Sequence, residues 1–319
     1  MVDGKPNKKR VRELVYMKML CLDGGGIRGV FAVSILHEIE KEYNQPIAAL
    51  VDLVAGTSTG SIIASSISIK KPMEEVLAGY KVYGKKIFTR QAKVGLFKSI
   101  YSDRHLRRFI MLAFGKRRMA DITSPLLIPA VDLTHGRPFI HRSNYGNKAT
   151  KDLSIHLWDA VLSSCSAPVY FPPNNIGNDY LSIDGGLWAN NPSMVCITEG
   201  VEYFKMKLED MEILSIGTGL QKIDFTIQKN KYWGVKQWLP FQFPSMKVTP
   251  KLLDLALQLS SESVSYQCKH LLGDNYIRLN KELGEEVPFD DVTYMEELIQ
   301  LGQAVYHEQK EGIRRFLKS

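Results

Sequence analysis

The sequence predicts an α/β fold in which a central, mainly parallel sheet carries helices on both of its faces. Two observations predict it. Short apolar runs of strand length alternate with longer stretches of helical periodicity along the 319 residues. Several of these runs lead directly into glycine-rich turns, as strands do where they connect to a following helix.

The predicted elements follow from these patterns in chain order. We expect strands near 17–22, 51–55, 127–132, 137–141, 180–183, 211–216 and 275–280. We expect helices near 30–44, 60–69, 73–83, 104–114, 157–165, 193–206, 250–268 and 294–317.

The first strand, Met17–Leu22, runs into the glycine-rich segment Asp23–Gly29, and a helix with apolar residues on one face follows. Such a strand–turn–helix gathers free backbone N–H groups around one point, where they can bind an anion. Gly24, Gly26 and Gly29 also fit the G-x-G-x-x-G motif of dinucleotide-binding proteins. That motif requires an acidic residue at the end of the second strand, which here ends in Ala55-Gly56, and no phosphate-binding P-loop motif occurs. A backbone oxyanion hole is therefore favoured, with Arg28 either holding the loop or attracting an anionic head group.

The second strand leads into Gly56-Thr57-Ser58-Thr59-Gly60, which fits G-x-S-x-G. This pattern indicates a sharp turn with Ser58 at its tip in a strained conformation, followed by a helix that starts near Thr59. The glycines allow strand and helix to approach closely, and the helix N-terminus offers unpaired N–H groups to a developing oxyanion.

The third motif is a short apolar strand that ends in Asp184-Gly185-Gly186. An isolated D-G-G is typical of a turn or a helix cap. Here the segment Ser163–Pro173 precedes it, Asn190-Asn191-Pro192 follows it, and a further glycine turn comes after the apolar strand near 211–216.

Together, four blocks make the chain resemble the patatin-like phospholipases. They are D-G-G-G-x-R-G at Asp23–Gly29, G-x-S-x-G at Gly56–Gly60, S-A-P-x-x-F-P-P at Ser166–Pro173 and D-G-G at Asp184–Gly186. The blocks occur in the family's order within residues 17–220. The resemblance implies a three-layer α/β fold and lipid acyl hydrolase activity by a Ser–Asp dyad, with Ser58 as nucleophile and Asp184 as base. It implies an oxyanion hole at Gly24, Gly25, Gly26 and Thr59, with supporting roles for Arg28, Gly29, Gly56, Gly60, Gly185 and Gly186.

An ordinary Ser–His–Asp triad is the alternative to the dyad. The seven histidines are His37, His105, His135, His141, His156, His270 and His307, and none of them lies in a glycine-rich turn. No histidine pair has metal-ligand spacing, so we expect neither a metal nor a cofactor.

The net charge of +7 is concentrated in one segment. Lys85–Arg118 contains eleven Lys and Arg residues against one acid, Asp103, with large apolar residues between them. This mixture suits an anionic membrane surface, and it also fits a helix with a buried apolar side and a solvated basic side. No nucleic-acid-binding motif is present, so we expect no nucleic acid partner. The aromatic, proline-containing segment Tyr232–Pro244 is a second candidate for membrane contact, as a lid or anchor, or for a packed surface loop.

We predict one catalytic domain over 16–319, with a motif-bearing core at about 17–220 and a C-terminal helical part at 221–319. A flexible basic leader is predicted at 1–15, and it lacks the apolar segment of a signal peptide. Four scattered cysteines without C-x-x-C spacing are typical of reduced core residues. Ile47–Ile69 carries a single charge, but its glycines and serines favour a buried strand–turn–helix over a membrane span. We therefore expect a cytoplasmic protein, peripheral at most on the inner face of the membrane.

The expected function is cleavage of acyl esters of glycerolipids, above all phospholipids. A narrower esterase or lysophospholipase is the first alternative. Some bacterial members of the resembled family are membrane-degrading effectors switched by a signalling nucleotide, and the sequence permits such an activator without demonstrating it. The alternative without catalysis is a nucleotide-binding module that uses Gly24–Gly29.

Overall fold

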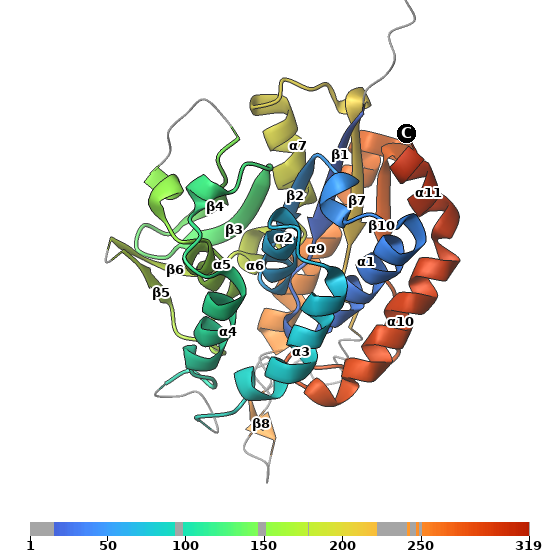
Figure 1. The fold of residues 1–319 in the computed structure, drawn as a ribbon. Helices are drawn as coiled ribbons and strands as arrows, with labels where there is room; N and C mark the ends of the chain where they lie inside the picture. Colours follow the sequence, from blue (N-terminus) through green and yellow to red (C-terminus); the bar gives the residue numbers. More distant parts are fainter. Residues whose placement is uncertain are drawn as a thin grey trace, which may run out of the picture.

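A computed structural model of the protein describes residues 16–92, 98–145, 151–177, 179–221, 241–242, 247–248 and 251–318 (Figure 1). The predicted leader at 1–15 lies outside the described residues, and so does the predicted aromatic loop apart from Phe241 and Gln242.

The central sheet has the strand order β10–β7–β1–β2–β3–β6–β5, and β4 also pairs with β3. The strands β10, β7, β1, β2 and β3 are parallel to one another, whereas β4 and β6 are antiparallel to β3, and β5 is antiparallel to β6. The predicted mainly parallel sheet is therefore confirmed. The strand bounds are β1 Met17–Leu22, β2 Leu53–Gly56, β3 Leu126–Asp132, β4 Arg137–Arg142, β5 Asn174–Ile176, β6 Tyr180–Asp184, β7 Met211–Ile216 and β10 Tyr276–Leu279.

Helices cover both faces of this sheet because successive side chains of its strands alternate between two apolar cores. In β1, Leu20 and Leu22 belong to the larger core, and Met19 and Cys21 belong to the smaller one; all four are fully buried. The larger core packs against α1 (Gly29–Tyr43), α2 (Thr59–Ser68) and α5 (Leu157–Cys165). The smaller core packs against α7 (Ser193–Glu202) and α9 (Lys251–Leu272).

The remaining helices and one short strand pair complete the described part of the fold. They are α3 (Met73–Ile87), α4 (Arg104–Phe114), the short α6 (Gly186–Ala189), the two-residue pair β8 (Phe241–Gln242) and β9 (Lys247–Val248), α10 (Met295–Glu308) and α11 (Lys310–Lys318). The strand β5 and the helix α6 were not predicted, because three or four residues are too few to show a period.

The prediction of one helix over 294–317 is wrong, since the chain forms α10 and α11 with a break at Gln309. Gln309 leaves helical geometry at φ −102° and ψ 13°. The apolar pattern continues through the break, which explains the error. The two helices also have different packing partners, since α10 packs on α1 and α11 packs on β7 and β10.

Two of the glycine motifs, G-x-S-x-G and D-G-G, are brought together at β3. Its Leu127–Asp132 segment pairs with β4 on one edge, so β2 and β6 must share the other edge. There β2 runs parallel to β3 and pairs with Leu126 and Leu127, whereas β6 runs antiparallel and pairs from Asp132 back to Ala130. The C-terminal ends of β2 and β6 therefore face each other across Pro129. The G-x-S-x-G turn follows one end and the D-G-G turn follows the other.

Candidate active site

The turn after β2 holds Ser58 in a strained backbone conformation, with φ 53° and ψ −122°. A non-glycine residue at positive φ is uncommon and marks a position that the surrounding structure enforces. The glycines on either side permit the close approach of strand and helix. A Cβ atom at Gly56 would lie 2.1 Å from the Gly60 carbonyl oxygen, and one at Gly60 would lie 2.3 Å from that of Leu22.

A residue that the sequence analysis missed, Ser164, ties this turn to the sheet. The Ser58 N–H donates to the Ser164 hydroxyl oxygen at 2.9 Å, and that hydroxyl donates to the Pro129 carbonyl at 2.6 Å. Ser164 lies at the end of α5 and is fully buried. Its neighbours in the sequence carried the S-A-P block, but nothing local distinguishes this serine from Ser163.

Asp184 ends β6 and is buried, with 4% of its surface exposed. The Gly186 N–H donates to its carboxylate at 2.7 Å. Burial raises the pKa of Asp184 to about 6, while hydrogen bonds from Gly186 and from the Ser58 side chain act in the opposite direction. A carboxylate with this pKa is a stronger base than an ordinary aspartate, and it lies next to the Ser58 hydroxyl.

The glycine loop presents backbone N–H groups to the same place. Gly26 adopts the left-handed region at φ +57°, and a Cβ atom there would lie 2.2 Å from the Phe289 carbonyl oxygen. Within the described residues, the N–H groups of Gly25, Gly26 and Thr59 have no backbone or side-chain acceptor that would occupy them. The predicted fourth donor, Gly24, is engaged, because its N–H donates to the Asn190 carbonyl at 3.1 Å.

Among the other predicted residues, Gly186 contacts the Asp184 carboxylate, whereas Gly29, Gly185 and Arg28 lie around this centre. Gly29 and Gly185 are close-approach positions, where a Cβ atom would lie 2.4 Å from the Thr59 hydroxyl and 2.3 Å from the Pro129 carbonyl oxygen. The Arg28 side chain is buried. It donates to Gln221 at 3.0 Å, and its guanidinium lies 5.6 Å from the centre of the Phe289 ring. It lines a smaller, polar cavity of about 420 Å³ and not the cavity that contains Ser58.

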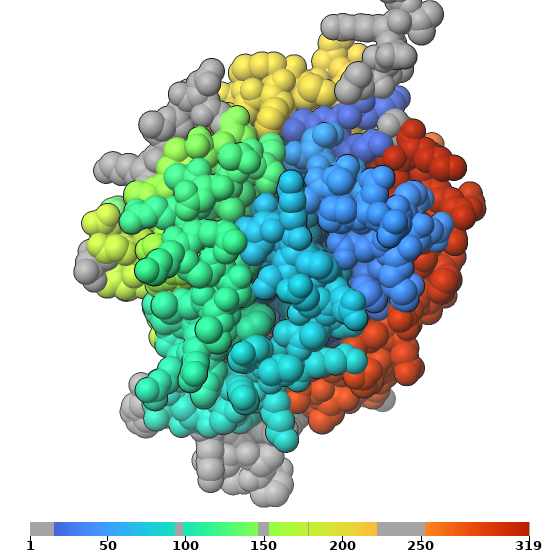
Figure 2. Space-filling view, in the orientation of Figure 1, coloured from blue at the N-terminus to red at the C-terminus, as the bar shows by residue number. Residues whose placement is uncertain are grey.

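Ser58, Asp184, Thr59, Gly25 and Gly26 all line one pocket with about 790 Å³ of empty space, part of it open to solvent. The rest of its wall is mostly apolar and comes largely from α3, α4 and the segment after α5. This part of the wall includes Tyr80, Ile87, Phe88, Leu106, Phe109, Tyr170 and Phe171. Figure 2 shows α3 and α4 side by side, in cyan and green, with a hollow between them. Such a wall suits an acyl chain better than a sugar or a nucleotide.

All seven histidines lie in the part of the chain that the structure describes, and none of them lines this pocket. Among the described residues, no cluster of three or more His, Cys, Asp or Glu side chains is placed to hold a metal ion. Among the same residues, no helix has the length and apolar character needed to cross a bilayer.

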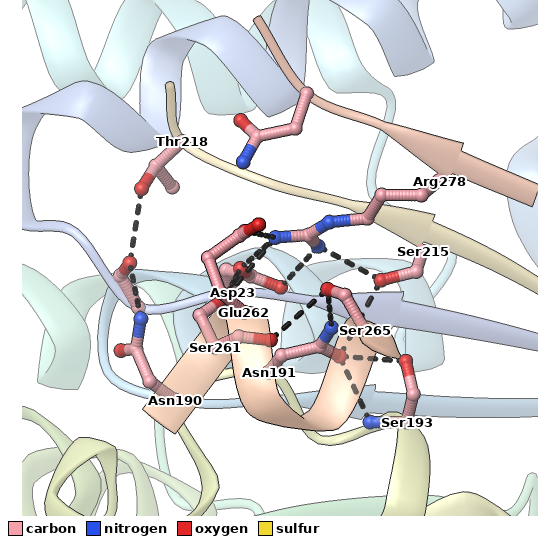
Figure 3. Close-up of polar contacts among 12 residues, drawn as sticks. Asp23, Asn190, Asn191, Ser193, Ser215, Thr218, Ser261, Glu262, Ser265 and Arg278 are labelled. Carbon is pink, nitrogen blue, oxygen red and sulfur yellow. Dashed lines mark hydrogen bonds and ion pairs between the residues drawn. The ribbon is translucent and has the colours of Figure 1, made fainter. Parts of the chain in front are cut away.

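A polar network behind the glycine loop was not found from the sequence (Figure 3). Arg278 of β10 forms an ion pair with Asp23 at 2.6 Å, and Ser261 of α9 donates to the same carboxylate. The Thr218 hydroxyl donates to the Gly24 carbonyl at 3.0 Å. The only sequence signal for this network is the glycine turn at 217–219, which lies at the same sheet edge as the loop.

The chain is similar in sequence to known proteins of one family. A sequence model of the family described as patatin-like phospholipase matches residues 20–197, more than half of the chain. The chain is 35% identical over 221 residues to a cGAMP-activated phospholipase of Escherichia coli, a match that covers 63% of this chain and 62% of the relative. It is 31% identical over 227 residues to a protein of the same name from Vibrio cholerae, covering 63% and 64%. It is 25% identical over 312 residues to patatin-like protein 1 of Arabidopsis thaliana, covering 83% and 74%. The chain thus spans less than two thirds of the length of the first two relatives.

Proposed function

Because the chain belongs to the patatin-like phospholipase family, we propose that it hydrolyses acyl esters of glycerolipids, above all phospholipids. One observation supports this most strongly. A strained serine, a buried aspartate of raised pKa and unoccupied backbone N–H groups line the same largely apolar pocket.

In the proposed reaction, the ester carbonyl lies over Ser58 with its acyl chain in the pocket. Asp184 accepts the proton of the Ser58 hydroxyl as its oxygen attacks the carbonyl carbon. The N–H groups of Gly25, Gly26 and Thr59 donate to the oxyanion that forms, and the N-terminus of α2 favours the same charge. Asp184 then returns the proton to the leaving alcohol. A water molecule, activated by the same carboxylate, releases the fatty acid from the acyl-enzyme.

We propose a dyad and not a triad because no histidine lines the pocket, whereas the Asp184 carboxylate lies within hydrogen-bonding reach of Ser58. Burial of Asp184 supplies the basicity that an exposed aspartate lacks. A hydroxyl is far less acidic than this carboxyl, so the oxyanion hole must carry much of the stabilisation of the transition state.

The test is hydrolysis of mixed phospholipid vesicles, followed by analysis of the released fatty acids and lysolipids. Ser58→Ala should lower turnover about a thousandfold or more, since no other group can form the acyl-enzyme. Asp184→Asn should be nearly as damaging. Ser68→Ala, at the far end of the same helix, is the matched control and should retain wild-type turnover.

Three outcomes would contradict the proposal. A histidine variant that folds but is as inactive as Ser58→Ala would favour the Ser–His–Asp triad over the dyad. Fluorophosphonate labelling of the Ser58→Ala variant would show that another residue is the nucleophile. Thermal stabilisation by NAD(P) without any ester turnover would favour the nucleotide-binding alternative.

We further propose that the enzyme binds an anionic membrane surface through α3 and α4. Both helices contribute to the pocket wall, and their outer faces carry exposed basic and apolar side chains. On α4 these include Arg104, Arg108, Met111 and Leu112, which recur at helical spacing on one face. Docking there would bring the pocket close to the lipid from which the acyl chain must be withdrawn.

Regulation by a signalling nucleotide is proposed on the names of the first two relatives, which describe cGAMP-activated phospholipases. The vesicle assay is therefore run with and without cGAMP. Activation that depends on Ser58 would support a regulated enzyme, and equal turnover in both conditions would remove cGAMP as its activator.

A further inference from the structure

The glycine loop begins at Asp23, whose side chain is held by Arg278. The two guanidinium nitrogens of Arg278 donate to the two carboxylate oxygens of Asp23, at 2.8 and 2.6 Å. Both residues are largely buried, with side-chain exposures of 15% for Arg278 and 3% for Asp23. A bidentate pair of this kind fixes orientation as well as position.

Arg278 reaches this loop from another part of the sheet (Figure 3). It lies on β10, two strands away from β1, and pairs in register with Ser215 of the intervening β7. Its guanidinium also donates to the hydroxyl oxygens of Ser215 at 2.9 Å and Ser261 at 3.1 Å. Ser261 donates in turn to Asp23, so β10, β7 and α9 meet at the first residue of the loop.

The next residue of the loop is fixed on both of its backbone groups. The Gly24 N–H donates to the Asn190 carbonyl, and the Gly24 carbonyl accepts from the Thr218 hydroxyl. A Cβ atom at Gly25 would lie 2.2 Å from that same hydroxyl, so the loop lies directly on the network. Gly25 and Gly26, which follow in the chain, line the pocket, and within the described residues their N–H groups have no acceptor.

We propose that Arg278 is a positioning residue for the oxyanion loop, acting through Asp23. An oxyanion hole lowers the barrier only if its donors are already in place when the charge develops. Without Arg278, a buried Asp23 carboxylate would lack its cation, and the loop would have to move to hydrate it. The inference rests on the proposed function and assigns part of the site to residue 278, outside the 20–197 region that the family model matches.

The experiment compares an ester with its thionoester, in which sulfur replaces the carbonyl oxygen. Sulfur accepts hydrogen bonds weakly, so the oxyanion hole contributes little to thionoester hydrolysis. Arg278→Gln should lower kcat for the ester about a hundredfold, the usual scale for a damaged oxyanion hole. The KM should change little, and thionoester turnover should fall far less. Arg278→Lys, which keeps the charge but not the bidentate geometry, should recover part of the loss.

The matched control is Arg142→Gln, which breaks another, partly buried ion pair, with Glu199 at 3.1 Å, away from the pocket. In this control the ratio of kcat for the ester to kcat for the thionoester should keep its wild-type value. If Arg278→Gln does not fold, Ser261→Ala removes one of the hydrogen bonds to Asp23 and should lower the ratio in the same direction. An unchanged ratio in a folded Arg278 or Ser261 variant would overturn the inference.

A second readout separates this inference from the proposed function. Amide hydrogen exchange of residues 23–28 should accelerate in Arg278→Gln and not in Arg142→Gln, whether or not the protein hydrolyses esters. If wild type shows no Ser58-dependent turnover, the proposed function fails and the exchange data alone decide the role of Arg278. Equal exchange in wild type and Arg278→Gln would contradict it.

Discussion

Asp184 carries its charge at an energetic cost. It is buried, and the groups that favour its ionised form are the Gly186 N–H and the Ser58 side chain, both uncharged. Burial raises the pKa of Asp184 from 3.8 to about 6, so the folded protein binds this proton more tightly than the unfolded chain does. Its contribution to stability is therefore full below pH 3.8 and is lost as the pH rises through 6. In the proposed mechanism the raised pKa of Asp184 makes it a usable base, and the burial that raises this pKa also destabilises the fold at neutral pH.

Asp184→Asn is therefore expected to abolish turnover and to stabilise the protein at pH 7. The shift to about 6 corresponds to a gain of at most about 3 kcal/mol in the free energy of unfolding at pH 7. Urea unfolding at pH 7 and at pH 4 measures it, and the gain should nearly vanish at pH 4. In wild type, kcat/KM should rise with pH up to about 6 and level off above it. An equal stability difference at both pH values would mean that ionisation of Asp184 is not its cause.

At the scale of elements, the turn between β2 and α2 depends on the absence of side chains at Gly56 and Gly60. The backbone of α2 approaches β1 so closely that a Cβ atom at Gly60 would overlap the Leu22 carbonyl oxygen. A backbone atom cannot move aside as a flexible side chain can, so the overlap must displace the helix or the strand.

Gly60→Ala is expected to destabilise the protein by about 1–3 kcal/mol, the usual range for overpacking. Gly312→Ala is the matched control, because its Cβ atom in α11 would have no neighbour closer than 3.8 Å. It should raise stability by about 0.5–1 kcal/mol, since alanine favours a helix over glycine. Urea midpoints of the two variants measure both effects. Equal effects would show that close approach does not limit this turn.

The helix α4 has a buried face and an exposed face of different character. Leu106, Ile110 and Phe114 are buried, whereas Met111 and Leu112 are 44% and 64% exposed. Of its basic residues, Arg107 is tied to Asp103 at 3.0 Å and lies over the Trp158 ring, so reversing its charge would disturb the fold. Arg104 and Arg108 are exposed and are better choices for a test of membrane binding.

Arg104→Glu with Arg108→Glu should reduce co-sedimentation with anionic vesicles but spare hydrolysis of a soluble short-chain ester. Each basic residue contributes about 1 kcal/mol near an anionic surface, and salt weakens that attraction. Met111→Ser with Leu112→Ser should also reduce binding, with less salt dependence, because insertion of apolar groups is not screened. Lys207→Glu with Lys269→Glu, on other parts of the surface, is the charge-matched control. Wild-type binding by both α4 variants would exclude this helix as the docking surface.

At the scale of the whole molecule, the sheet and its central residues could be predicted because they depend on local pattern. The strands at 17–22 and 211–216 have the predicted bounds, since each apolar run ends at a glycine turn. Ser58 and Asp184 were singled out through the turns that carry them, and the structure places both residues on one pocket. Ser164 and Arg278 could not be found, because their partners are 106 and 255 residues away in the chain. Neither the periodicity of apolar residues nor the spacing within a motif indicates a contact between residues so far apart in the chain.

A buried histidine is expected to limit the stability of the whole molecule in acid. His141 on β4 is fully buried, and within the described residues neither of its ring nitrogens has a hydrogen-bond partner. Burial lowers the pKa of His141 to about 3 from 6.5, so its neutral form is favoured in the folded state. The stability that it contributes is complete above pH 6.5 and is lost progressively as the pH falls below that value.

Wild type should lose free energy of unfolding between pH 7 and pH 5, and His141→Leu should reduce this loss by about 2 kcal/mol. Urea unfolding at both pH values measures the difference. His270→Leu, at an exposed position on α9, is the matched control and should keep the wild-type pH dependence. The same pH dependence in His141→Leu as in wild type would assign the acid sensitivity to other groups.

The shared edge of β3 has a consequence for how this site can vary among sequences. The separation of Ser58 from Asp184 is set by the register of β2 and β6 along β3, and not by the length of chain between them. Insertions in the intervening loops would leave that separation unchanged. A slip of one residue in β6 would instead move Asp184 by about 3.3 Å and turn its side chain to the opposite face of the sheet. The site therefore tolerates large changes in loop length and almost none in strand pairing.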